Sequence, residues 1–187
     1  MTGKNKKIVL IAAFLGVSFA LFAKKTPETP TDDSYDNTPD TQKPSGVTYA
    51  VFNKNFGNIK NSGKIYNGEI SANESTYKKF RTWQYGAAAL IAHVQRYIKG
   101  VFVGKLDTIS LIINTYAPPS ENNTAYYISF VERETGINRN TKLNANDKEQ
   151  MYKICDAIAK MEDRTAAKNF TRILFDAAFS IAQTQNN

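Results

Sequence analysis

From residue 83 onwards, apolar residues recur at the three- and four-residue spacing of helices that bury one face. The pattern predicts helices that begin near Trp83, Ile109, Asn122 or Asn123, Asn146 or Asp147, and Thr165. Breakers fix three of the expected ends, which fall at Gly100, before the proline pair 118–119, and before Gly136. The last helix is expected to reach about Gln183, with a buried face made of Phe170, Leu174, Ala177, Ala178 and Ile181.

Residues 47–82 lack this periodicity and are rich in Asn, Gly and Tyr. The alternation within them predicts loops with short strands near residues 64–70 and 76–80. A small β-rich region beside five helices predicts an α+β, mostly α, domain.

The N-terminal segment has a different pattern. Residues 8–23 are apolar or small, carry no charge, and lie between Lys4, Lys6 and Lys7 on one side and Lys24 and Lys25 on the other. As a helix they would span roughly 24 Å, short for a hydrocarbon core of about 30 Å but extended by the flanking lysines. The segment predicts an anchor over residues 1–25; a cleaved signal peptide and a buried core helix are the alternatives.

Charge and composition then divide the rest of the chain. Residues 26–46 hold four of the six prolines and five acidic residues, which predicts a semi-extended linker. The net charge is +7, of which +6 falls on residues 47–187, the expected functional domain. The lysines of that domain are dispersed rather than striped, which argues against nucleic acid as the partner.

Several kinds of chemistry are excluded by residue counts. The chain has one cysteine, Cys155, and one histidine, His93. The single cysteine excludes a disulfide framework and a cysteine-built zinc site, and the single histidine argues against a Ser-His-Asp triad or a His-rich metal site. The glycines form neither a P-loop nor a dinucleotide-binding motif. We predict no metal and no cofactor, and we interpret Cys155 as a core residue and His93 as a structural one. Carboxylates must carry any catalysis.

Glu162 is the first candidate. It falls four residues after Ile158 on an apolar helical stripe, so the spacing turns its carboxyl towards the buried face at the C-terminal end of the helix. Apolar surroundings and the negative helix end both raise a carboxyl pKa, as protonation of a glycosidic oxygen requires. The alternative is a solvated or ion-paired residue near Arg164.

Glu121 is the second candidate, in the segment YAPPSENNT before a predicted helix. A helix N-terminus lowers a carboxyl pKa, so Glu121 suits an anionic role: positioning water, holding a sugar hydroxyl, or capping the helix. The neighbouring aromatic and amide side chains suit a polysaccharide groove or an ordinary polar loop; they belong to Tyr116, Asn122, Asn123, Tyr126 and Tyr127.

Four segments, in this order, resemble a family of phage virion-associated lytic or structural domains. They are NKNFGNIK (53–60), WQYGAAAL (83–90), TISLIINTYAPPSENNTAYYI (108–128) and AIAKMED (157–163). The family is similar to lysozyme-superfamily enzymes that cleave peptidoglycan. The resemblance implies a lysozyme-like domain, and it places Glu162 where those enzymes carry their catalytic glutamate. Asn58 and Tyr85, in the first two segments, are further candidates for substrate binding.

The order of the segments implies a circular permutation, because the β-rich stretch that normally follows the catalytic glutamate here precedes it. Three residues depart from the family pattern. Phe56 replaces a proline, Ala88 replaces an arginine, and Asp163-Arg164 replace Asn-Gly.

The expected function is a membrane-anchored, virion-associated enzyme that degrades peptidoglycan during phage entry or exit. It would be a lytic transglycosylase or a muramidase/glucosaminidase, with Glu121, Glu69 or Glu74 as a second carboxylate in the hydrolytic case. Expected partners are peptidoglycan strands, a virion internal or host inner membrane through residues 8–23, and capsid proteins. The single-pass protein would hold its C-terminal domain outside the cytoplasm. The alternative is a non-catalytic virion membrane or structural protein with a glycan- or capsid-binding groove.

Overall fold

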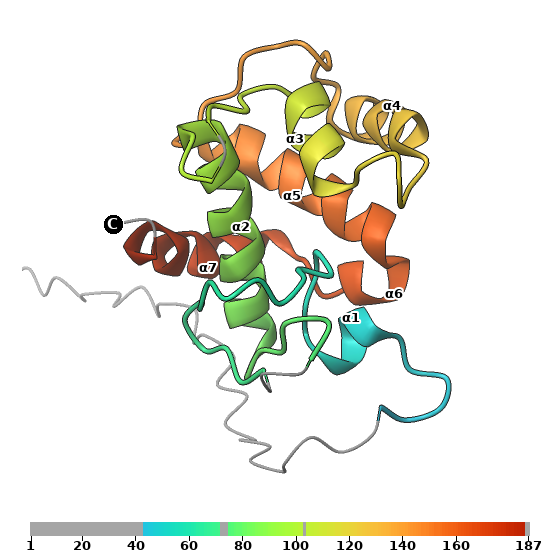
Figure 1. Cartoon of the computed structure of the whole chain (residues 1–187). Helices are drawn as coiled ribbons and strands as arrows, with labels where there is room; N and C mark the ends of the chain where they lie inside the picture. Colours follow the sequence, from blue (N-terminus) through green and yellow to red (C-terminus); the bar gives the residue numbers. More distant parts are fainter. Residues whose placement is uncertain (1–42, 72–74, 103, 186–187) are drawn as a thin grey trace, which may run out of the picture. The chain divides into compact units, whose positions relative to one another are not determined.

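Helices and loops make up the part of the chain that the computed structural model describes, residues 43–71, 75–102 and 104–185 (Figure 1). The helices are α1 (Tyr49–Phe52), α2 (Trp83–Lys99), α3 (Ile109–Tyr116), α4 (Thr124–Thr135), α5 (Lys148–Glu162), α6 (Arg164–Ala167) and α7 (Arg172–Thr184).

Helix α2 forms the centre of the core. Its first turn is capped by the Thr82 side chain, which accepts a hydrogen bond from the Tyr85 N–H, and it ends at Gly100 in the left-handed region. Residues 87–92 are all fully buried, an unusually wide apolar face for one helix. The helix packs mainly against α7, and Gly86 brings its backbone against the carbonyl of Lys54, leaving no room for a Cβ.

The next three predicted helices are confirmed, together with their caps. Asn123 caps α4 by accepting from the Tyr126 N–H, and Gly136 ends that helix in the left-handed region. Asp147 caps α5 by accepting from the N–H groups of Glu149 and Gln150. Helices α4 and α5 pack on one another, and α3 packs on α4.

The predicted single helix from Thr165 to Gln183 is wrong. The structure has two helices there, α6 and α7, because the Thr171 side chain caps a new helix by accepting from the Leu174 N–H. The residues that α7 buries also differ from the predicted ones. Phe175, Ala178 and Ala182 are fully buried, while the predicted core residues Leu174, Ala177 and Ile181 are only half-buried.

The α+β prediction is also wrong, because the described residues contain no strand. The predicted strand segments meet in one isolated antiparallel bridge, Glu69 with Phe80, and a second bridge joins Tyr77 to Lys60 in the preceding loop. A side chain takes the place of the ladder: the buried Asn55 amide donates to the carbonyls of Ile59 and Lys78 at 3.1 and 2.9 Å. Side chains that bond the backbone in this way compete with sheet formation.

The membrane localisation is corrected as well. Among residues 43–71, 75–102 and 104–185, no helix is both long enough and apolar enough to cross a membrane. The expectation of a transmembrane helix and a single-pass membrane protein is therefore wrong for the structure as described. The predicted anchor at residues 8–23 and most of the linker at residues 26–46 lie outside the described residues.

Candidate functional site

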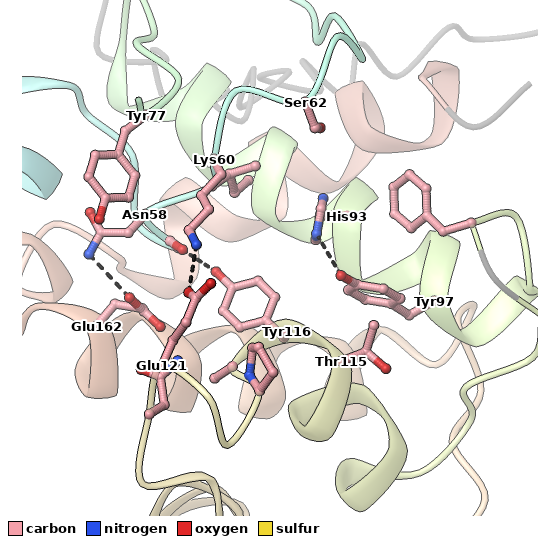
Figure 2. Close-up of a pocket in the computed structure, with 16 residues that line it drawn as sticks. Asn58, Lys60, Ser62, Tyr77, His93, Tyr97, Thr115, Tyr116, Glu121 and Glu162 are labelled. Atoms are coloured by element: carbon pink, nitrogen blue, oxygen red, sulfur yellow. Dashed lines mark hydrogen bonds and ion pairs between the residues drawn. The ribbon is translucent and has the colours of Figure 1, made fainter. Parts of the chain in front are cut away.

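Glu162 is the last residue of α5, and both of its carboxylate oxygens accept hydrogen bonds. The Tyr127 hydroxyl, from α4, donates to Oε1 at 2.8 Å, and the Asn58 amide, from the loop before α2, donates to Oε2 at 3.1 Å. Three segments that are distant in sequence therefore meet at one carboxyl group, and Figure 2 shows the bond from Asn58. The direction of the side chain follows from the apolar stripe of α5, as predicted.

The pKa of Glu162 is raised above its ordinary value. Burial is the largest cause, and the hydrogen bonds from Tyr127 and Asn58 act in the opposite direction. The same burial, together with the charge of Glu162, raises the pKa of the Tyr127 hydroxyl well above its usual range, so that group remains a donor. The site thus holds a carboxyl group that favours its neutral form more than a surface glutamate does.

The loop that carries Asn58 is shaped by Asn55. The Asn55 side-chain oxygen accepts from the Ile59 N–H at 3.0 Å, and the Asn55 backbone carbonyl accepts from the Asn58 N–H at 3.1 Å. These bonds hold Asn58 at a φ of +44°, a left-handed conformation that asparagine tolerates better than most residues. Within the described residues, Asn58 Oδ1 is buried and accepts no hydrogen bond.

A pocket of about 470 Å³ opens beside this carboxyl group. Its walls come from the loop of residues 57–62, from α2, from the end of α3 and the turn after it, and from Glu162. Tyr116 joins two of these walls, because its hydroxyl donates to the carbonyl of Gly57. A pocket of this size, with a few convergent polar groups, is typical of a small-molecule or glycan site.

Glu121 lies on the same pocket wall, so the structure brings both candidate carboxylates to one site. It does not cap α4. Its Oε2 is 2.6 Å from Nζ of Lys60, and both side chains are more than half exposed. The ion pair raises the pKa of Lys60, mainly through the hydrogen bond to Glu121. Because the pair is exposed, it contributes little to stability, and a charged ligand can compete with it.

The other predicted residues divide between this pocket and other places. Tyr116, Asn122 and Asn58 line it. Asn123 is the cap of α4, and Tyr126 is exposed on that helix without lining the pocket.

Tyr85 lies against Gly68, in a separate open hollow lined also by Ser180 and Thr184. Of the other carboxylates considered, Glu69 is buried in an ion pair with Lys78 at 2.9 Å, and Glu74 lies outside the described residues.

Sequence reasoning missed several residues that the fold brings to the site. They are the pocket residues Lys60, Ser62, Tyr77, His93, Tyr97, Phe102 and Thr115. Tyr127 was expected among the aromatic groups of a groove, but its bond to Glu162 was not, although a buried tyrosine hydroxyl needs a hydrogen-bond partner. The loop residues Lys60 and Ser62 belong to no periodic element, so no pattern pointed to them.

The prediction of a structural, hydrogen-bonded His93 is confirmed. Its Nδ1 lies 2.8 Å from the Tyr66 hydroxyl, and its Nε2 lies 3.3 Å from the Tyr97 hydroxyl. Burial, with Arg96 and Lys78 nearby, lowers the pKa of His93 to about 4. Cys155 is fully buried in the core, as expected, and burial raises its pKa.

The residues that depart from the family pattern are also explained. Phe56 is fully buried, with its ring 4.8 Å from Trp83 and 4.9 Å from Phe170. Ala88 is buried inside α2, where a longer side chain has no space to enter. Asp163 ends α5 and at the same time caps α6, because its side chain accepts from the N–H groups of Thr165 and Ala166.

Comparison with known proteins finds a likeness to a phage protein. No family model matches it. One relative is 38% identical over 96 residues, which make up 49% of this chain and 58% of the relative. That relative is Protein P5 of Pseudoalteromonas phage PM2. The chain therefore spans less than two thirds of the relative's length. The match confirms the expected likeness to a phage protein and does not extend to a lytic family.

Proposed function

We propose that this chain is a phage virion protein that cleaves a glycosidic bond of peptidoglycan during entry or exit, with Glu162 as the general acid. The environment of Glu162 carries the proposal: a half-buried carboxyl of raised pKa on the wall of a pocket of about 470 Å³. A carboxylic acid that stays protonated closer to neutral pH is what protonation of a glycosidic oxygen needs. The resemblance of YAPPSENNT and AIAKMED to phage lytic domains supports the same assignment.

The chemical step we favour uses one carboxyl group. Glu162 gives its proton to the oxygen that links N-acetylmuramic acid to N-acetylglucosamine, and the bond from that oxygen to C1 breaks. The C6 hydroxyl of the muramic residue then bonds to C1 and returns its proton to Glu162. The products are a 1,6-anhydro end and a free hydroxyl, and no water is consumed. Tyr127 and Asn58 orient the carboxyl group throughout.

Hydrolysis is the other route, in which a second carboxylate activates a water. Glu121 is the residue in the pocket that could do so. Its ion pair with Lys60 at 2.6 Å favours the first route, because the pair would have to open before the Glu121 carboxylate could contact a water. In the first route Glu121 and Lys60 hold the substrate at the pocket mouth.

A digest of purified sacculi with the full chain tests the proposal. Mass spectrometry should find anhydromuropeptides that disappear with Glu162→Gln and persist with Glu134→Gln, an exposed glutamate outside the pocket. Reducing-end muropeptides would instead assign hydrolysis and promote Glu121. Intact sacculi with the folded wild-type chain would refute the enzymatic proposal.

A non-catalytic virion protein with a glycan- or capsid-binding groove is the second candidate. One observation favours it: the Glu162 carboxyl is bonded at both oxygens, as a carboxyl that only joins three segments would be. The digest, combined with a pull-down of sacculi, separates the two candidates. A binding protein would be pulled down with sacculi but would release no fragments.

A further inference from the structure

The pocket continues beyond Glu162 into a region of different chemistry. Figure 2 shows Glu162 and Asn58 at one side of the pocket, Tyr116 in the middle, and His93 and Tyr97 at the other side. We call the far region, lined by His93, Tyr97, Phe102 and Thr115, the aromatic end. A volume of about 470 Å³ falls in the range of about 300–1,000 Å³ that holds a drug-sized ligand. The pocket therefore has room for more than the linkage that meets Glu162.

The aromatic end is built from rings that support one another. The His93 ring lies 5.0 Å from the Tyr97 ring and 5.1 Å from the Phe102 ring, and the Tyr97 and Phe102 rings are 5.2 Å apart. Aromatic rings at these distances attract one another, so each ring of the wall is packed against two others. Packed aromatic rings offer apolar contact area to a ligand at little cost in conformational entropy.

Two residues of this wall, His93 and Tyr97, are hydrogen-bonded to each other, and His93 is also bonded to Tyr66. Tyr66 bonds Nδ1 of His93, and Tyr97 bonds Nε2. Burial keeps both tyrosines protonated by raising their pKa values, and His93 is neutral near pH 7 because its pKa is lowered to about 4. A neutral imidazole carries one N–H, so one ring nitrogen donates and the other accepts.

Either tautomer leaves Tyr97 with hydrogen-bonding capacity for a ligand. If Nε2–H donates to the Tyr97 oxygen, the Tyr97 O–H can donate into the pocket. If Tyr97 donates to Nε2, its oxygen can accept there. Thr115 adds an acceptor, since its hydroxyl donates to the Leu111 carbonyl at 3.2 Å and keeps free lone pairs. A ligand hydroxyl, which both donates and accepts, suits this wall in both states.

We propose that His93, Tyr97, Phe102 and Thr115 form a subsite for a neutral sugar ring, next to the ring bound at Glu162. The four residues carry no charge near pH 7, and the cations nearest to His93, which are Arg96 and Lys78, are buried and do not line the pocket. A charged ligand group would therefore lose hydration there without a counter-charge on that part of the pocket surface. A sugar ring has apolar C–H faces for the aromatic wall and hydroxyls for Tyr97 and Thr115. The identity of the neighbouring ring rests on the proposed function.

Binding of N-acetylglucosamine oligomers of one to four residues tests the subsite. The full chain with Glu162→Gln serves as the parent, because it binds without turnover, and titration calorimetry gives the affinities. The affinity of the parent should rise with oligomer length. Tyr97→Phe should lower the affinity for the tetramer about three- to tenfold by removing one hydroxyl, and Phe102→Ala should lower it about tenfold. Both substitutions should reduce the increase of affinity with oligomer length.

Tyr152→Phe is the matched control, because Tyr152 is a half-buried tyrosine that does not line the pocket. Tyr97→Phe keeps the ring and its packing, so the test survives if Phe102→Ala fails to fold. Equal tetramer affinity for parent, Tyr97→Phe and Phe102→Ala, or no binding by the parent, would overturn the subsite. Length-dependent binding without cleavage of sacculi would instead keep the subsite and refute the proposed enzyme.

Discussion

Replacement of Glu162 by glutamine should stabilise the protein at neutral pH. The glutamine keeps both contacts: its Oε1 can accept from Asn58, and its Nε2 can donate to the Tyr127 hydroxyl, which is free to turn its proton away. What disappears is a carboxylate that burial disfavours, as the raised pKa of Glu162 indicates.

The magnitude follows from two opposing contributions. Hydrogen bonds to a charged group contribute about 1.5–3 kcal/mol and neutral ones about 0.5–1.5 kcal/mol, so the change weakens each bond by about 1 kcal/mol. Desolvation of a buried carboxylate costs several kcal/mol. The direction of the pKa shift means that desolvation outweighs the bonds, and we expect a net gain on the order of 1 kcal/mol. For a chain of 187 residues this raises Tm by about 2–4 °C.

The raised pKa of Glu162 also determines how the stability difference between variant and wild type changes with pH. In the wild type, Glu162 binds its proton more tightly when folded, so its stabilising contribution is full below the ordinary carboxyl pKa and is lost as the pH rises through the folded pKa. Glutamine has no such loss. The difference in Tm between variant and wild type should thus be near zero in acid and largest at neutral pH.

Thermal unfolding followed by circular dichroism across this pH range measures the effect, with Glu134→Gln as the exposed control. A Tm for Glu162→Gln at or below that of the wild type at pH 7 would refute the assignment of Glu162 as a destabilised, functionally poised carboxyl.

Three further predictions concern the surroundings of the site. Tyr127→Phe removes a hydrogen bond that lowers the pKa of Glu162, so the alkaline limb of a sacculus-digestion profile should move to higher pH; an unchanged limb would contradict the role of Tyr127. Gly86→Ala would place a Cβ 1.8 Å from the Lys54 carbonyl oxygen, so it should lower the free energy of unfolding in urea by about 3 kcal/mol. Gly63→Ala is the control, since Gly63 has a positive φ but open space around it, and it should cost about 1 kcal/mol. Asp163→Ala and Asp147→Ala should each cost about 1 kcal/mol as lost helix caps, but only Asp163→Ala, next to Glu162, should also reduce digestion; equal digestion by both would refute the coupling.

The helices could be predicted from the sequence because their signals are local. The caps Asn123 and Asp147 and the end residues Gly100 and Gly136 each act within a few residues of the chain. The break between α6 and α7 escaped prediction because Thr171 resembled an ordinary polar position inside a continuing apolar pattern. Its role as a cap depends on φ and ψ values that the pattern does not reveal.

The predicted strands failed for a non-local reason. Residues 64–70 and 76–80 meet at the Glu69–Phe80 bridge, but Tyr77 is bridged to Lys60 in another loop, and the Asn55 side chain bonds the Lys78 carbonyl. Local alternation carries no information about such a competitor. It also gives no sign that an extended pair will lack the third strand that stabilises a sheet.

The candidate site was predicted in part. Glu162 follows from a stripe on one helix, and Tyr116, Glu121 and Asn122 come from one continuous segment, so a single stretch of sequence holds most of that information. The partners Tyr127 and Asn58 bond Glu162 across 35 and 104 residues of chain. Helical periodicity places a residue on a face of its own helix, but it does not show what lies opposite.

These two long-range bonds also determine when, during folding, Glu162 acquires the environment described above. The Glu162 carboxyl acquires its surroundings only after residue 58, residue 127 and the end of α5 have come together. Contacts of such wide sequence separation form late, because closing the intervening loops must precede them. A chain still emerging from the ribosome therefore carries glutamate 162 as an ordinary solvated side chain. Completion of the fold is therefore the step that gives Glu162 the surroundings on which the proposed chemistry depends.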